Sequence, residues 1–161
     1  MSAADYLNKK FDILAFRGGT DTGDVQLAQS LFDATIGGEV CTGMQKLAQQ
    51  WLLEFLTIRG SMGYHLVTRG SDFLAYLRQG RIRTEFDVQA YFDFAAEQVA
   101  INLRNDLTET APADERLKSA FLDNISLISG SLELQVTLTS DAETTREVIL
   151  PLPYTPINMT L

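Results

Sequence analysis

The strictest pattern in this chain is an alternation of apolar and polar side chains over residues 132–139. The apolar members are Leu132, Leu134, Val136 and Leu138, and the polar members are Glu133, Gln135, Thr137 and Thr139. A period of two places each set on its own face of a β-strand, so the pattern predicts a strand with one buried and one hydrated face. The Ser-Gly-Ser sequence at 129–131 predicts a hairpin turn before it. Residues 141–144 predict a second turn and 147–150 a return strand, which makes the end of the chain a β-meander.

The middle of the chain has the period of a helix instead. Over residues 40–57 the apolar side chains recur at three- and four-residue steps, which predicts an amphipathic helix. Thr84 and Asp87 resemble a capping box in which Asp replaces the usual Glu, and the apolar stripe after them predicts a second helix over 85–107. Two main helices packed on a mostly antiparallel sheet, with a C-terminal β-meander, make a small single-domain α+β fold.

The length of 161 residues is that of about one domain, which we place at residues 11–150. Residues 1–10 are polar and are interpreted as a flexible or partner-ordered segment. Residues 151–161 are proline-rich and are expected to form a tail, because proline has no N–H with which to continue a β ladder. Short strands are predicted within 11–28. Glycines punctuate residues 59–83, which predicts an ordered loop region with one helical turn near its end.

The net charge of −8 narrows the classes of partner. A chain this acidic repels phosphate backbones and anionic lipid, so we expect neither nucleic acid nor a membrane as its partner. We find no apolar run of the roughly 20 residues that span a bilayer, and the first residues do not resemble a secretory signal. The single cysteine, Cys41, excludes an internal disulfide and a multi-cysteine metal site. The expectation is a soluble protein of a reducing compartment.

The residue types that carry chemistry form no recognisable catalytic pattern. His65 is the one histidine and has no nucleophile or orienting group near it in sequence. Cys41 is expected to be a small packing residue. The loop over residues 18–23 has the outer glycines of a phosphate-binding loop, but Asp24 stands where that loop needs a lysine. We therefore predict no catalytic residue, cofactor or metal, although two carboxylates placed as in a glycosidase are not excluded by the sequence.

The triplet Arg-Gly-Ser occurs twice, at 59–61 and at 69–71. The interpretation that we favour is two turns in which glycine adopts a positive φ. In the functional alternative, Arg59 and Arg69 bind carboxylates of a partner protein, which suits the fork geometry of the guanidinium group.

These features occur in a familiar order within residues 52–77. A Leu-Thr step at 56–57 is followed by Gly-Ser steps at 60–61 and 70–71, with Tyr64 between them. In this order the segment resembles the baseplate wedge, or sheath-initiator, family of contractile phage tails, a family that has also carried a lysozyme label.

The resemblance continues, in order of elements, over about residues 11–155. The family has a Glu-Pro-Arg motif that opens a strand, and the matching sequence here is Asp114-Glu115-Arg116. Asp114 stands for the family glutamate and Glu115 for the proline, so Arg116 alone is kept. By this resemblance we expect Asp114 and Arg116 to form the local ion pair of the motif.

The resemblance implies a structural role in a virion tail baseplate that is assembled in the host cytoplasm, or in a phage-derived secretion apparatus. Its implied partners are the tail sheath protein and other wedge proteins, with six copies in each baseplate. The family offers β edges to arms of the sheath, which would add as extra strands. We expect that edge at 132–139, with Leu134, Val136 and Leu138 in contact with the partner, or at the return strand 145–150. The alternatives are a lysozyme-like peptidoglycan hydrolase and a soluble adaptor that binds one protein partner.

Overall fold

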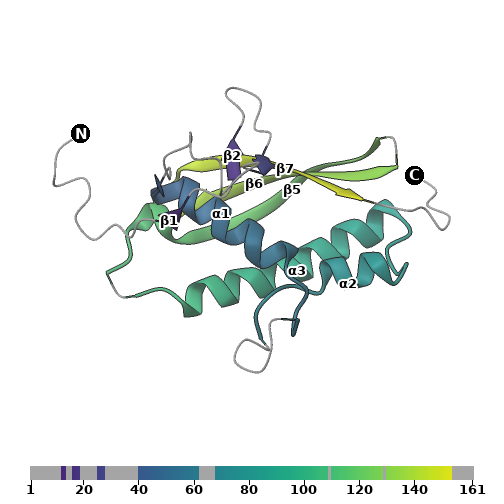
Figure 1. The fold of residues 1–161 in the computed structure, drawn as a ribbon, viewed down its shortest axis with the longest axis horizontal. Helices are drawn as coiled ribbons and strands as arrows, with labels where there is room; N and C mark the ends of the chain where they lie inside the picture. Colours follow the sequence, from purple (N-terminus) through teal and green to yellow (C-terminus); the bar gives the residue numbers. More distant parts are fainter. Residues whose placement is uncertain are drawn as a thin grey trace, which may run out of the picture.

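The computed structural model describes residues 12–13, 16–18, 25–27, 40–61, 68–108, 110–128 and 130–153. Within these residues it shows an α+β domain in which three helices lie on a three-stranded antiparallel sheet (Figure 1). The helices are α1 (Gly43–Leu56), α2 (Phe73–Arg78) and α3 (Glu85–Asn105), followed by the 3-10 helix η2 (Ala113–Glu115). The sheet consists of β5 (Leu117–Ile128), β6 (Ser131–Ser140) and β7 (Thr145–Pro153). The predicted fold class is confirmed.

The alternating stretch forms β6, and its apolar side chains are buried while the side chains between them are half-buried. The order of the sheet is β5-β6-β7, so β6 has a hydrogen-bonded neighbour on each side. The expectation that residues 132–139 offer a free edge is therefore wrong. Leu134, Val136 and Leu138 are 0% exposed and belong to the core rather than to a partner surface.

The return strand is longer than the sequence predicts. β7 continues through Pro151, which lies opposite Glu133, to Pro153, which lies opposite Ser131. The expected stop at Pro151 is wrong because β7 is an edge strand of this sheet. An edge strand accommodates proline where the missing N–H would point away from its neighbour.

The helices cover one face of the sheet, with α1 against β7 and α3 against β5. Their buried side chains form one cluster with those of the sheet. At its centre are four aromatic rings that are fully buried, those of Trp51, Phe55, Phe73 and Phe92. The Trp51 and Phe55 rings are stacked with centroids 4.8 Å apart. Because both main helices and the sheet share this core, each element depends on the others for burial of its apolar face.

The predicted capping box begins α3. The Thr84 side chain accepts a hydrogen bond from the Asp87 N–H at 3.1 Å, and the Asp87 carboxylate accepts from the Thr84 N–H at 3.0 Å. Asp87 also accepts from the N–H of Arg83 at 3.0 Å. These bonds, that from the Arg83 N–H foremost, lower the pKa of Asp87 below its ordinary value. The helix ends at Asn105, two residues before the predicted end.

Two short pairs of antiparallel strands are formed by segments that precede α1 in the sequence. β1 (Asp12–Ile13) pairs with β4 (Val40–Cys41), and β2 (Phe16–Gly18) pairs with β3 (Val25–Leu27). The pairs account for the strands predicted within 11–28, and because Val40 and Cys41 belong to β4, helix α1 begins later than predicted. The glycine-rich turn between β2 and β3, the segment 1–10 and most of the predicted tail lie outside the described residues. No helix in the described part of the chain combines the length and the apolarity that a membrane span requires.

Candidate functional site

The two Arg-Gly-Ser triplets lie side by side. The Ser71 N–H donates to the Thr57 carbonyl at 2.8 Å, and the Arg59 N–H donates to the Ser71 carbonyl at 3.0 Å. Ile58, which precedes the first triplet, and Ser71 of the second thereby form a parallel bridge. The central glycines have φ values of 76° and 91°, so both triplets are the glycine turns that we favoured from the sequence.

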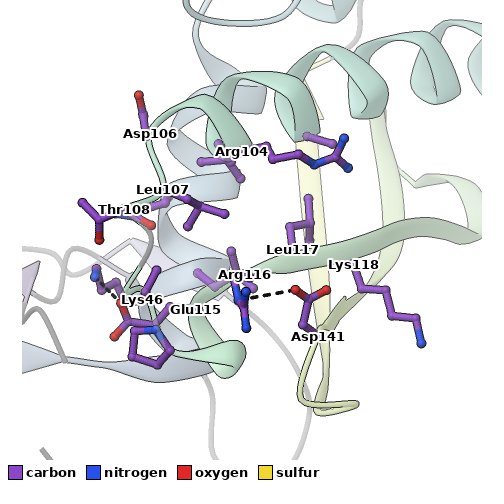
Figure 2. A pocket seen from close by; sticks show the side chains of 16 residues that line it. Lys46, Arg104, Asp106, Leu107, Thr108, Glu115, Arg116, Leu117, Lys118 and Asp141 are labelled. Carbon is purple, nitrogen blue, oxygen red and sulfur yellow. Dashed lines mark hydrogen bonds and ion pairs between the residues drawn. The ribbon is translucent and has the colours of Figure 1, made fainter. Parts of the chain in front are cut away.

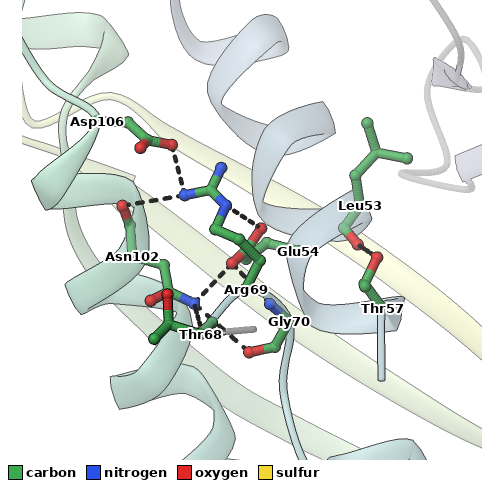
Figure 3. Close-up of polar contacts among 8 residues, drawn as sticks. All are labelled: Leu53, Glu54, Thr57, Thr68, Arg69, Gly70, Asn102 and Asp106. Atoms are coloured by element: carbon green, nitrogen blue, oxygen red, sulfur yellow. Dashed lines mark hydrogen bonds and ion pairs between the residues drawn. The ribbon is translucent and has the colours of Figure 1, made fainter. Parts of the chain in front are cut away.

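Arg69 makes polar contacts with both main helices (Figure 3). Its Nη1 lies 2.6 Å from Asp106 Oδ2, and its Nε lies 3.5 Å from Glu54 Oε2. Arg69 Nη1 also donates to the Asn102 carbonyl at 3.4 Å. These contacts engage Arg69 within the chain, whereas Arg59 is exposed. That either arginine binds a partner stays a prediction.

Glu54 is the centre of this polar cluster, and no sequence motif had selected it. Its carboxylate is buried and accepts from the Gly70 N–H at 2.8 Å and from Asn102 Nδ2 at 2.6 Å. Asn102 Nδ2 also donates to the Thr68 carbonyl at 3.2 Å. In Figure 3 these groups converge from α1, α3 and the second turn. The cluster fixes that turn against both main helices.

A groove of about 670 Å³ opens between α1, the C-terminal end of α3 and the start of β5 (Figure 2). Aliphatic side chains and charged side chains both line it. Its cations are Lys46, Arg104, Arg116 and Lys118, and its anions are Asp106, Glu115 and Asp141. The volume lies within the range of about 300–1,000 Å³ that is typical of ligand pockets.

Arg116, the kept residue of the family motif, lies in this groove. Its Nε is 3.4 Å from Asp141 Oδ2, and both side chains are about two-fifths exposed, at 42% and 43%. The turn after β6 brings Asp141 beside Arg116. The ion pair of Arg116 with Asp114 stays a prediction. The backbone holds that turn in place, since the Asp141 N–H donates to the Arg116 carbonyl at 2.9 Å.

The buried acid of the motif is Glu115 rather than Asp114. Glu115 Oε2 lies 2.6 Å from Lys46 Nζ, and the two side chains are only 5% and 8% exposed. Glu115 Oε1 also accepts from the N–H of Gly43, the first residue of α1, at 3.3 Å. A carboxylate at this end of a helix is favoured by the helix dipole. Lys46 and Glu115 are 69 positions apart, so no local pattern could have predicted their pairing.

The sheet has two edge strands, β5 and β7, and the predicted position 145–150 lies on β7. Among the described strands β7 is hydrogen-bonded to β6 alone, whereas β3 contacts it but pairs with β2. Since the N–H groups of alternate residues point to the same side of a strand, the prolines indicate which side faces outward. Glu147 and Ile149 have the same parity as Pro151 and Pro153, so their N–H groups point away from β6. No described strand pairs with that side of β7.

The described residues hold no cluster of three or more His, Cys, Asp or Glu side chains that could bind a metal ion. Cys41 is buried, as expected of a packing residue, and its Sγ lies 3.9 Å from Gln49 Oε1. The two buried carboxylates, Glu54 and Glu115, each hold a cation and a backbone N–H in place. His65 lies outside the described residues.

Comparison with protein-family models, with curated proteins and with solved structures found no match to this chain. The fold, the β7 edge and the groove are therefore the observations on which a functional argument can rest.

Proposed function

We propose that this chain is a structural subunit of a contractile-tail baseplate, a wedge component that anchors and nucleates the tail sheath by strand addition. The observation that carries the proposal is the edge of β7, a strand of nine residues that is hydrogen-bonded on one side only among the described strands. An edge strand presents unpaired N–H and C=O groups, and an extended arm of a partner satisfies them. The family resemblance supplies the partner, the sheath protein, and the copy number of six.

The residue content of the edge supports this role. The outward N–H groups of Glu147 and Ile149 can donate to an incoming strand, whereas Pro151 and Pro153 cannot. The prolines limit pairing to the first part of β7, which protects the edge against indiscriminate strand pairing. The added strand is therefore expected to lie beside residues 145–150, one of the two positions that the sequence suggested.

The experiment is co-purification of the tagged chain, expressed with the proteins encoded around it, and identification of the bound proteins by mass spectrometry. The test variant is Glu147→Pro/Ile149→Pro, which removes the two outward N–H donors without removing a donor to β6. The control is Glu147→Ala/Ile149→Ala, which changes the same side chains and keeps both N–H groups.

We expect the unchanged chain and the alanine variant to recover sheath-like and wedge-like subunits, and the proline variant to lose the sheath-like subunit. Thermal melting of the isolated variants shows whether each remains folded. Recovery of the sheath-like subunit by a folded proline variant would place its binding site elsewhere. A chain that recovers no such subunit contradicts the proposal, and a peptidoglycan-release assay then tests the hydrolase alternative.

A further inference from the structure

The groove beside Arg116 has a charge that differs in sign from that of the whole chain. The protein carries a net charge of −8, yet the groove is lined by one more cation than anions. Three of the cations have acidic partners: Lys46 pairs with Glu115, Arg116 with Asp141, and Lys118 with Glu143 outside the lining. A local excess of positive charge on an acidic surface directs an anionic ligand to that place.

Arg104 is the cation without a partner. It is exposed, and it forms no ion pair with any residue in the described part of the chain. Its closest acidic neighbour in sequence, Asp106, is engaged by Arg69 at 2.6 Å. Figure 2 shows the Arg104 guanidinium extending away from Asp106. All of its N–H donors are thus available to a ligand, in a geometry that matches a carboxylate.

Arg116 adds a second guanidinium on the same groove. Its contact with Asp141 is a loose one: the 3.4 Å separation lacks hydrogen-bond geometry, and the buried Nε–H has no acceptor. A half-exposed pair of this kind contributes little stability, so a ligand carboxylate can compete for the remaining donors of Arg116.

The floor of the groove is aliphatic, which defines the other half of the ligand. Leu47, Leu103, Leu107 and Leu117 line it between the charged groups. A small inorganic anion would leave these side chains uncovered, whereas a peptide with acidic and aliphatic residues would contact both parts.

From these observations we propose that the groove binds an acidic-aliphatic segment of a partner protein, whose carboxylates pair with Arg104 and Arg116. The site is separate from the β7 edge, and the proposal holds whichever protein uses that edge. It gives the chain a second contact by which a partner segment can be held.

The test is a titration of the purified chain with a fluorescein-labelled decapeptide of alternating Glu and Leu, followed by fluorescence anisotropy. The test variant is Arg104→Gln, which removes an exposed and unpaired cation and so leaves the fold intact. The matched control is Arg59→Gln, which makes the same change of charge at an exposed arginine outside the groove. A decapeptide of alternating Lys and Leu tests the sign of the charge.

We expect Arg104→Gln to weaken binding of the acidic peptide about five- to tenfold, and Arg59→Gln to change it less than about twofold. Binding should also weaken as the salt concentration rises from about 50 to 500 mM. An equal loss in both variants, or no binding of the acidic peptide, overturns the proposal. Equal binding of the lysine peptide overturns it as well, because it would indicate apolar contact elsewhere, for example at the exposed Phe86 and Phe94 of α3.

Discussion

Position 70 requires glycine for two reasons, a positive φ and a lack of space for a side chain. Its φ is 91°, and a Cβ built on it would lie 2.4 Å from the Thr57 carbonyl oxygen. We predict that Gly70→Ala lowers the free energy of unfolding by about 3–5 kcal/mol, because backbone strain adds to a clash with rigid backbone. The control is Gly80→Ala, where φ is 66° and nothing lies within 4 Å of the new Cβ. Strain alone should cost about 1–2 kcal/mol there. Equal losses in urea denaturation would contradict the role of the clash.

Lys46 and Glu115 form the most enclosed ion pair that the described residues contain. We predict that Lys46→Met costs about 3–5 kcal/mol of stability, because it leaves the Glu115 carboxylate buried without its cation. The double variant Lys46→Met/Glu115→Gln should be more stable than Lys46→Met, since no buried charge remains and the amide oxygen can still accept from Gly43. Denaturant unfolding of Lys46→Met, Glu115→Gln and the double variant measures this coupling. A double variant less stable than Lys46→Met would mean that the unpaired Glu115 carboxylate is not the cause of the loss of stability.

At the scale of an element, the stability that the N-terminal cap gives to α3 is expected to depend on pH. The lowered pKa of Asp87, caused first by the Arg83 N–H, means that folding favours the carboxylate. Its contribution is present above the ordinary carboxyl pKa of about 3.9 and is lost as the pH falls through the lower folded-state pKa. We predict that the difference in Tm between the native chain and Asp87→Asn is largest near neutral pH and disappears at acidic pH. A difference that persists below the lowered pKa would exclude charge as its origin.

The neutral half of the same cap can be tested separately. Thr84→Ala removes the acceptor for the Asp87 N–H and should cost about 0.5–2 kcal/mol. Thr84→Ser keeps a hydroxyl acceptor and is the control. Thermal melting should rank the three chains as threonine, serine and then alanine, and an alanine variant as stable as the native chain would show that the cap is replaced by water.

The elements that could be predicted from the sequence are those with a local cause. The period of residues 40–57, the Thr84 capping box and the alternation of β6 each follow from side chains that are close in sequence. The predictions that were wrong concern features that depend on segments distant in sequence. Whether β6 is central depends on where β5 and β7 pair, because an edge strand and a central strand can show the same alternation.

The ion pairs in and near the groove could not be predicted from the sequence for the same reason. Arg116 could be selected by resemblance, but its partner Asp141 comes from a turn beyond two strands. Glu54 and Asn102 are hydrogen-bonded across 48 positions, so no local pattern pairs them. The sequence shows which kinds of group each side chain can bind. The group that it does bind depends on how α1, α3 and the sheet pack together.

At the scale of the whole molecule, the helices and the sheet share one core and should unfold together. Leu134 is fully buried at the centre of the sheet. We predict that Leu134→Ala lowers stability by about 2–5 kcal/mol in a single transition seen equally by tryptophan fluorescence and circular dichroism. The folded fraction should still recover its partners, because the side chain does not reach the surface. Loss of partners by a fully folded variant would restore Leu134 to the interface.

The position of β7 also sets the order in which the domain can be completed. Val148, Leu150 and Leu152 of this strand lie in the same cluster as Trp51 of α1, and α1 lies against β7. During synthesis the ribosome therefore releases all three helices and the first two strands before the strand that seals α1 exists. Until that moment the side chains of β7 cannot cover α1. The strand that we propose to recruit a partner is thus the last of the described elements to be synthesised, so the proposed binding edge appears only when the described core can be completed.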